Sequence, residues 1–152
     1  MKNRLAMLAL FLWLITVGVL GWFFVRGNTT EGSDGRTSIL LGTGERNLIL
    51  GEMRTLLSGT HDILESLDRG DPRTAAQAAR AIGTAAAADV NPALMAKLPL
   101  AFKSLGMSVH RDMDGFAAAA ESGKSPAELR ALLTGTLSKC VACHAAWRLD
   151  SH

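Results

Sequence analysis

Aromatic residues are scarce in this chain of 152 residues, and neither positive nor negative side chains predominate. Aromatic side chains make up 5% of the sequence and tyrosine is absent, so no cluster of rings is available to stack on nucleic-acid bases. The formal net charge of +2 is too small to attract nucleic acid or an acidic partner strongly. The chain also lacks paired carboxylates, a nucleophile with its base and a phosphate-binding loop, so the sequence predicts a protein that is not an enzyme.

Cysteine is limited to Cys140 and Cys143, in the stretch KCVACHAAWR at residues 139–148. A structural zinc site needs further ligands at fixed spacing, whereas the other histidines are scattered. A thioredoxin-like pair lies at a helix N-terminus in a fold with strands, and a disulfide this short constrains little. Cys-x-x-Cys-His is the attachment pattern of c-type haem. Thiols one turn apart reach both vinyl groups of a porphyrin, and His144 follows as an iron ligand. The sequence favours haem, with a disulfide or redox pair as the alternative.

Charged residues are also missing from positions 5–25, and acidic residues from the whole chain before Glu31. At about 1.5 Å per residue, a helix of this length spans roughly 30 Å, the hydrocarbon thickness of a bilayer. The apolar region of a cleaved signal peptide is shorter, about 7–15 residues, and ends at a small-residue site. We therefore expect residues 1–26 to form an uncleaved transmembrane anchor in contact with membrane lipid.

The basic residues beside this apolar run indicate its orientation. Lys2 and Arg4 precede the run and Arg26 follows it, which favours a cytoplasmic N-terminus by the positive-inside rule. The sequence thus predicts a single-pass protein of the inner membrane whose main domain lies in the periplasm. Residues 27–44 are rich in Gly, Ser and Thr, and we expect them to form a flexible linker.

Helix signals continue through residues 45–149. Apolar spacings of three and four, N-caps and proline positions predict four helices: about residues 45–67, 72–88, 93–121 and 125–147. Pro99 divides the third segment into a short turn and a main helix. Because connections are short and no strand alternation is visible, the sequence predicts an all-α fold. Its expected architecture is an antiparallel four-helix bundle with an N-terminal transmembrane helix.

A four-helix bundle that carries Cys-x-x-Cys-His close to its C-terminus resembles the class II cytochromes c, the cytochrome c-prime superfamily. The ending from Cys140 to Arg148 looks like the family's Cys-x-x-Cys-His-x-x-aromatic-Arg. The resemblance covers residues 45–149. It implies one covalent haem c between the helices, with His144 as the fifth iron ligand. Some members of the family leave the sixth position open and bind small gases. Others fill it with a methionine of the first helix and are low-spin electron carriers.

The residue on the other side of the iron is expected on the first helix. Met53 lies on its apolar stripe near the family's distal position, and we expect it to be the second metal ligand. A thioether stabilises ferrous iron. Leu56 and Leu57 are candidate wall residues. Trp147 is expected against the porphyrin edge, and Arg148 beside a haem propionate.

Weaker candidates remain on other parts of the chain. His61 and His110 are alternative iron ligands, and Arg46 is a second candidate for a propionate. The favoured function is the transfer of single electrons between redox protein partners. The alternatives are a five-coordinate cytochrome that binds NO or CO, and a haem-relay subunit of a larger membrane complex. Members of the family often dimerise through their first two helices, and the alanine-rich second helix permits a homodimer here.

Overall fold

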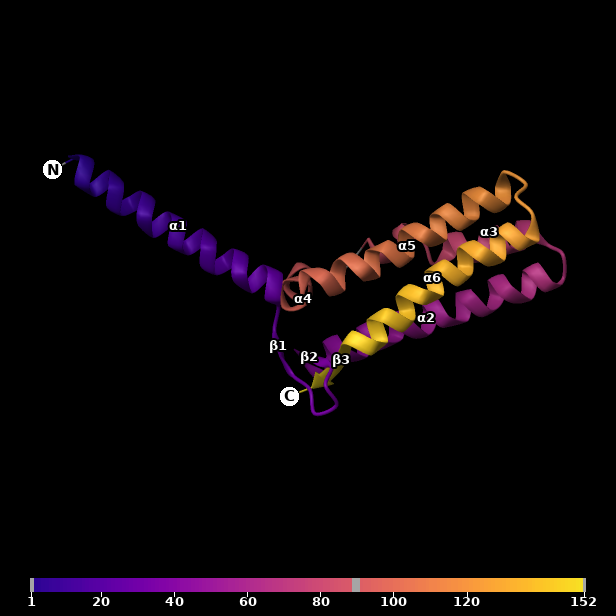
Figure 1. The fold of residues 1–152 in the computed structure, drawn as a ribbon, viewed down its shortest axis with the longest axis horizontal. Coiled ribbons are helices and arrows are strands. Elements are labelled where there is room, and N and C mark those ends of the chain that lie inside the picture. The colour runs from indigo at the N-terminus through magenta and orange to yellow at the C-terminus, as the bar shows by residue number, and fades with distance from the viewer. Residues whose placement is uncertain (1, 89–90, 152) are drawn as a thin grey trace.

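The computed structural model describes residues 2–88 and 91–151, and this part of the chain is mostly helical (Figure 1). It contains six α-helices, one 3-10 helix and three short strands. In chain order these are α1 (Lys2–Arg26), β1 (Thr29–Glu31), β2 (Thr37–Leu41), α2 (Thr43–Asp68), α3 (Pro72–Ala81), η1 (Thr84–Ala87), α4 (Pro92–Lys97), α5 (Leu100–Glu121), α6 (Pro126–Ala146) and β3 (Trp147–Ser151).

Local side-chain caps set the helix starts where the sequence predicted them. The Asp71 carboxylate accepts a hydrogen bond from the Thr74 N–H at 3.0 Å and begins α3. Ser125 and Glu128 form the predicted capping box of α6, each side chain accepting from the other residue's N–H. These starts are therefore confirmed.

Two glycines terminate helices in the expected places, while the second predicted helix proves shorter. Gly70 and Gly123 follow α2 and α5 with φ of 71° and 81°, a conformation that favours glycine.

Helix α3, however, ends at Ala81 rather than near residue 88. The Asp114 carboxylate accepts hydrogen bonds from the N–H and the hydroxyl of Thr84, at 3.0 and 2.6 Å, and draws the chain into η1 instead.

The core consists of two apolar clusters. The first joins α2, α3, α5 and α6, with the small side chains of α3 allowing close approach: Ile63, Leu67, Ala75, Ala76, Ala79, Ile82, Val109, Met113, Phe116, Ala117, Ala120, Leu129 and Leu133. The second joins β2 to α2, α4 and α5: Ile39, Leu41, Ile49, Leu94, Leu98 and Phe102.

The helices contact each other in the order α2, α3, α5, α6, but α2 and α6 have little direct contact. A closed four-helix bundle is therefore not established.

Residues 27–44 differ most from the sequence-based prediction. Expected to be a flexible linker, they form β1, β2 and the start of α2. Strand β2 pairs antiparallel with β1 and parallel with β3, from Thr37 opposite Trp147 to Leu41 opposite Ser151. The prediction of an all-α fold was wrong in this respect, whereas the fourth helix, expected to end at about residue 147, ends at Ala146. A strand of five residues is too short to show clear alternation, and its partner lies at the far end of the sequence.

Helix α1 is long and apolar enough to span a membrane. An 18-residue window within Asn3–Arg26 has a mean hydropathy of 2.4, and none of that window is buried. The helix is joined closely to the domain that follows it. The Asn28 N–H donates to the Lys97 carbonyl at 2.7 Å. The Lys103 ammonium donates to the Phe24 carbonyl at 3.4 Å and lies 3.9 Å from the centre of the Phe24 ring. These contacts leave no free tether between α1 and the domain.

The packing of β2 yields a first test. Ile39 is fully buried in the second cluster, so Ile39→Ala should lower the free energy of unfolding by about 2–5 kcal/mol. Chemical denaturation of the full chain in detergent, followed by circular dichroism, measures this change. Thr37→Ala, at the exposed end of the same strand, is the matched control and should stay within about 0.5 kcal/mol of the original. Equal stability of the two variants would contradict the placement of β2 in the core.

Candidate functional site

A pocket of about 180 Å³ lies where α6 ends beside α2. Five residues predicted as site residues line it: Met53, Cys143, His144, Trp147 and Arg148. The structure thus brings α2 and the end of α6 to one space, which we call the cysteine pocket. Its remaining walls are Arg36, Arg46, Leu50, Phe102 and Leu149.

Helix α6 carries two free thiols, of which Cys143 lines the cysteine pocket and Cys140 does not. Cys140 and Cys143 are half-buried and, being three residues apart, lie on one side of the helix. The Cys140 Sγ is 3.8 Å from the Thr136 carbonyl oxygen. Burial raises the pKa of both thiols, and the neighbouring Cys140 adds to this effect at Cys143. A redox-active cysteine pair requires a lowered pKa, so this environment disfavours the redox alternative.

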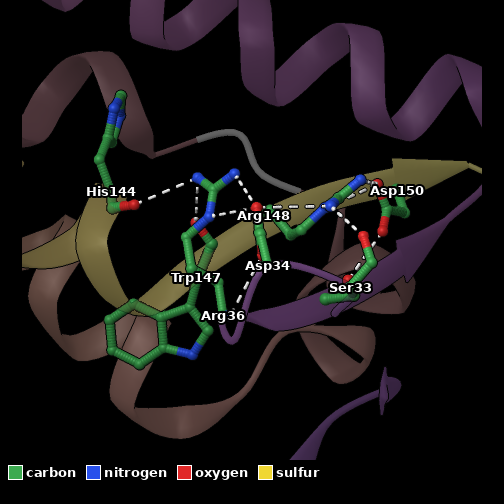
Figure 2. A network of polar contacts seen from close by, with 8 residues as sticks. Ser33, Asp34, Arg36, His144, Trp147, Arg148 and Asp150 are labelled. Atoms are coloured by element: carbon green, nitrogen blue, oxygen red, sulfur yellow. Dashed lines mark hydrogen bonds and ion pairs between the residues drawn. The ribbon is translucent and has the colours of Figure 1, made fainter. Parts of the chain in front are cut away.

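His144 stands next to the second thiol, in the last turn of α6, with its side chain exposed. Its carbonyl oxygen accepts a hydrogen bond from Arg36 at 3.2 Å. Figure 2 shows the imidazole ring turned away from this polar network. Within the described ranges no polar group contacts the ring, so its nitrogens are available to a metal.

Arg36 ties the hairpin of β1 and β2 to the end of α6 (Figure 2). Its Nη1 donates to the carbonyls of His144 and Trp147, at 3.2 and 3.5 Å. Its Nε and Nη2 donate to the Asp34 carboxylate at 2.9 and 2.6 Å, and these bonds lower the pKa of Asp34 to about 2. The carbonyls at a helix end need such donors. Sequence reasoning missed Arg36, because the contact spans 108 residues of chain and nothing local signals it.

Arg148 lines the cysteine pocket as predicted, but its guanidinium already has partners. It donates to Asp150 at 2.8 and 3.1 Å and to the Ser33 hydroxyl at 3.3 Å, and it lies 3.4 Å from Asp34. Arg46, the weaker candidate, donates its Nε–H to the Leu149 carbonyl at 3.0 Å. Across residues 2–88 and 91–151, Arg46 forms no ion pair, so it is the arginine of the pocket better placed to receive an anion.

Met53 is the candidate of the first predicted helix that reaches the cysteine pocket. It is half-buried and packs on the second cluster together with Cys143 and Trp147. Leu56 packs on the first cluster instead, and the Leu57 side chain is 71% exposed. Neither leucine lines the cysteine pocket. The wall that was expected from Leu56 and Leu57 is formed instead by Leu50, Phe102 and Trp147.

Apolar side chains are exposed on the two helices that flank the pocket. On α2, Leu57 and Leu64 follow Met53 at helical spacing and are 71% and 39% exposed. On α6, Leu137 and Val141 are 37% and 71% exposed. In the described part of the chain, these side chains are left open to solvent on the two helices. Exposed apolar patches of this kind commonly mark a binding site.

A second, larger cavity of about 580 Å³ lies between α2, α4 and α5. His110 lines it, is buried, and lies 2.9 Å from the Ile82 carbonyl through Nδ1 and 3.6 Å from the Glu52 carboxylate through Nε2. The Glu52 carboxylate raises the pKa of His110. Neither alternative histidine ligand lines the cysteine pocket: His110 belongs to this apolar cavity, and His61 is exposed beside Asp62.

Comparisons of the chain with protein-family models, with curated proteins and with solved structures give no match. The chemistry of the cysteine pocket is therefore inferred from the residues of this chain. An imidazole and a thioether can bind a transition metal, and the neighbouring thiols can form covalent bonds to a bound group.

The contact between His110 and Glu52 predicts a pH dependence of stability. Because the folded-state pKa of His110 is raised above 6.5, its stabilisation is complete below that pH and is lost as the pH rises through the folded-state value. Asp114 is also close enough for His110 to lower the pKa of its carboxyl. Glu52→Gln should therefore cost about 0.5–1 kcal/mol at pH 6, and less at pH 9.

Denaturation of both proteins between pH 5 and 9 measures this difference. Glu31→Gln removes an exposed carboxylate from β1 and serves as the control, with no pH-dependent change expected. A destabilisation by Glu52→Gln that is the same at every pH would show that His110 is not charged beside Glu52.

Proposed function

We propose that this protein is a membrane-anchored monohaem c-type cytochrome that carries single electrons and catalyses no reaction of its own. The observation that carries the proposal is the shared lining of the cysteine pocket, where Met53 of α2 lies with Cys143 and His144 of α6. An attachment thiol and two iron ligands thus border one space. The resemblance of the C-terminal motif to that of class II cytochromes c supports the same assignment.

The residues of the pocket have distinct roles in this proposal. Cys140 and Cys143 would hold the haem as thioethers, each S–H adding across one vinyl group. When bound, the haem would supply an iron that accepts and returns one electron. His144 and Met53 would be the iron ligands, and the soft thioether of Met53 would favour the ferrous state. Phe102 and Trp147, which meet edge to face at 5.8 Å, exclude water.

The surroundings of the pocket fit a group larger than the enclosed space. A volume of about 180 Å³ takes only part of a porphyrin, so the rest would lie between α2 and α6. There it would cover exposed apolar side chains such as Leu57 and Val141. A haem in this position would supply the contact that α2 and α6 lack, completing an antiparallel four-helix bundle. Arg46 at the rim suits a propionate.

The proposed location of the protein in the cell rests on α1. We place α1 in the inner membrane, with its N-terminus in the cytoplasm and the cysteine pocket in the periplasm. The helix is long and apolar enough for this role, and the basic residues at its start support the orientation. The electron partners would then be redox proteins of the membrane or the periplasm.

Removal of the two cysteines tests the covalent attachment. The full chain, produced together with a c-type haem maturation system, should carry one haem that survives denaturing electrophoresis. The double variant Cys140→Ser and Cys143→Ser should carry none, because no thioether can form. Haem staining and the pyridine haemochrome spectrum measure both. Ser138→Ala, an exposed change on the same helix, should keep its haem. An original chain that emerges from maturation without covalent haem would overturn the proposal.

Substitution of Met53 tests the second ligand. The original protein should have a low-spin reduced spectrum with a sharp alpha band, and Met53→Ala should become high-spin, bind CO and have a lower reduction potential. Met107→Ala is the matched control, since Met107 lines the apolar cavity and not the cysteine pocket. A Met53→Ala spectrum that stays low-spin would exclude this ligand. An original protein that is already high-spin and binds CO would favour the gas-binding alternative.

A further inference from the structure

The apolar cavity has no role in haem attachment, yet it has the size of a small-molecule site. Its volume of about 580 Å³ falls within the roughly 300–1,000 Å³ typical of ligand pockets. The walls are mainly apolar and come from α2, α4 and α5: Leu48, Leu94, Met95, Leu98, Phe102 and Met107.

Two buried polar side chains lie at opposite ends of this cavity. Lys103 and His110 are 8% and 5% exposed and both line it from α5. They are seven residues apart, two helical turns, which places their backbones roughly 10.5 Å from each other on the same side of the helix. Lys103 donates to the carbonyls of Met95 and Phe24, at 3.0 and 3.4 Å. An ammonium has three N–H donors, and the one not bonded to a carbonyl lies beside the Phe24 ring, 3.9 Å from its centre, so a ligand at this end would compete with that ring.

The Lys103 end of the cavity adjoins the membrane anchor. The Lys103 ammonium contacts both the carbonyl and the ring of Phe24, in the last turns of α1. Leu48 lines the cavity and is 60% exposed, so part of the apolar lining is open at the surface. The cavity is therefore both open at the surface and in contact, through Lys103, with the end of α1.

Another wall of the apolar cavity adjoins the cysteine pocket. Phe102 lines both spaces and packs edge to face on Trp147, with 5.8 Å between the ring centres. A ring held in the apolar cavity is therefore separated by a single side chain from the pocket that contains Met53 and Cys143.

We propose that the apolar cavity binds the head group of a membrane quinone or quinol. Such a ring is flat and has one oxygen at each end, matching apolar walls with Lys103 near one end and the His110–Glu52 pair near the other, and its isoprenoid tail would extend toward α1. As an electron donor, a role that rests on the proposed function, a bound quinol would lose two electrons and two protons and leave as quinone. One electron would go to each of two ferric haems in two protein molecules, and the two protons would pass to water.

Filling the cavity tests the proposal. A Cβ at Gly106, on the α5 wall, would meet no atom within 4 Å, so Gly106→Leu places a side chain in open space and also favours the helix. Gly51→Leu does the same from α2, where only an Arg54 nitrogen lies at 3.8 Å. Gly115→Leu, on α5 and equally open but outside the cavity lining, is the matched control.

The binding of decylubiquinone to the full chain in detergent micelles, measured by isothermal titration calorimetry, gives the readout. We expect saturable binding to the original chain, binding at least tenfold weaker in Gly106→Leu and Gly51→Leu, and a change of less than twofold in Gly115→Leu. Absence of binding, equal binding by all four proteins, or full competition by decanol, which has a chain but no ring, would each overturn the proposal.

The haem content of the same samples separates this proposal from the previous one. Protein that binds decylubiquinone but lacks covalent haem would refute the cytochrome assignment alone. Protein that carries haem but binds no quinone would refute the quinone site alone.

Discussion

The parallel pairing of β2 with β3 is the constraint on which the site depends. Strand β2 leads directly into α2, and β3 continues directly from α6, so their register fixes the start of one helix against the end of the other. Arg36 reinforces this junction by bonding to the carbonyl of His144. The first cluster and the Arg130–Asp68 ion pair hold the other ends of α2 and α6, whereas the strand pairing sets their separation at the cysteine pocket.

Features set by neighbouring residues could be predicted from the sequence. The capping box at Ser125, the glycine after α2 and the apolar run of α1 each act within a few residues, and the structure contains all three. The Cys-x-x-Cys-His motif is equally local, because Cys140, Cys143 and His144 lie within five positions. Met53 could be singled out because helical spacing places it on the apolar stripe.

Features set by contacts between distant residues could not be predicted. Ile39 belongs to an apolar run of only three residues within a stretch rich in Gly, Ser and Thr, and its strand pairs with residues more than a hundred positions away. The partners of Arg148 follow from the same sheet. The apolar cavity follows from the early end of α3, because Asp114 draws the chain into η1 at Thr84. Had α3 continued to residue 88, it would have covered this side of α2.

The junction at Lys103 and Phe24 also has a consequence for encounters at the membrane. A domain on a loose tether can tilt and rise to meet partners of many shapes. Here the anchor is clamped to the domain within a few residues of its end. With α1 in a bilayer, the cysteine pocket therefore stays at one height above the lipid surface. A partner in the same membrane would have to present its binding surface at that height, and it would meet this protein by lateral diffusion.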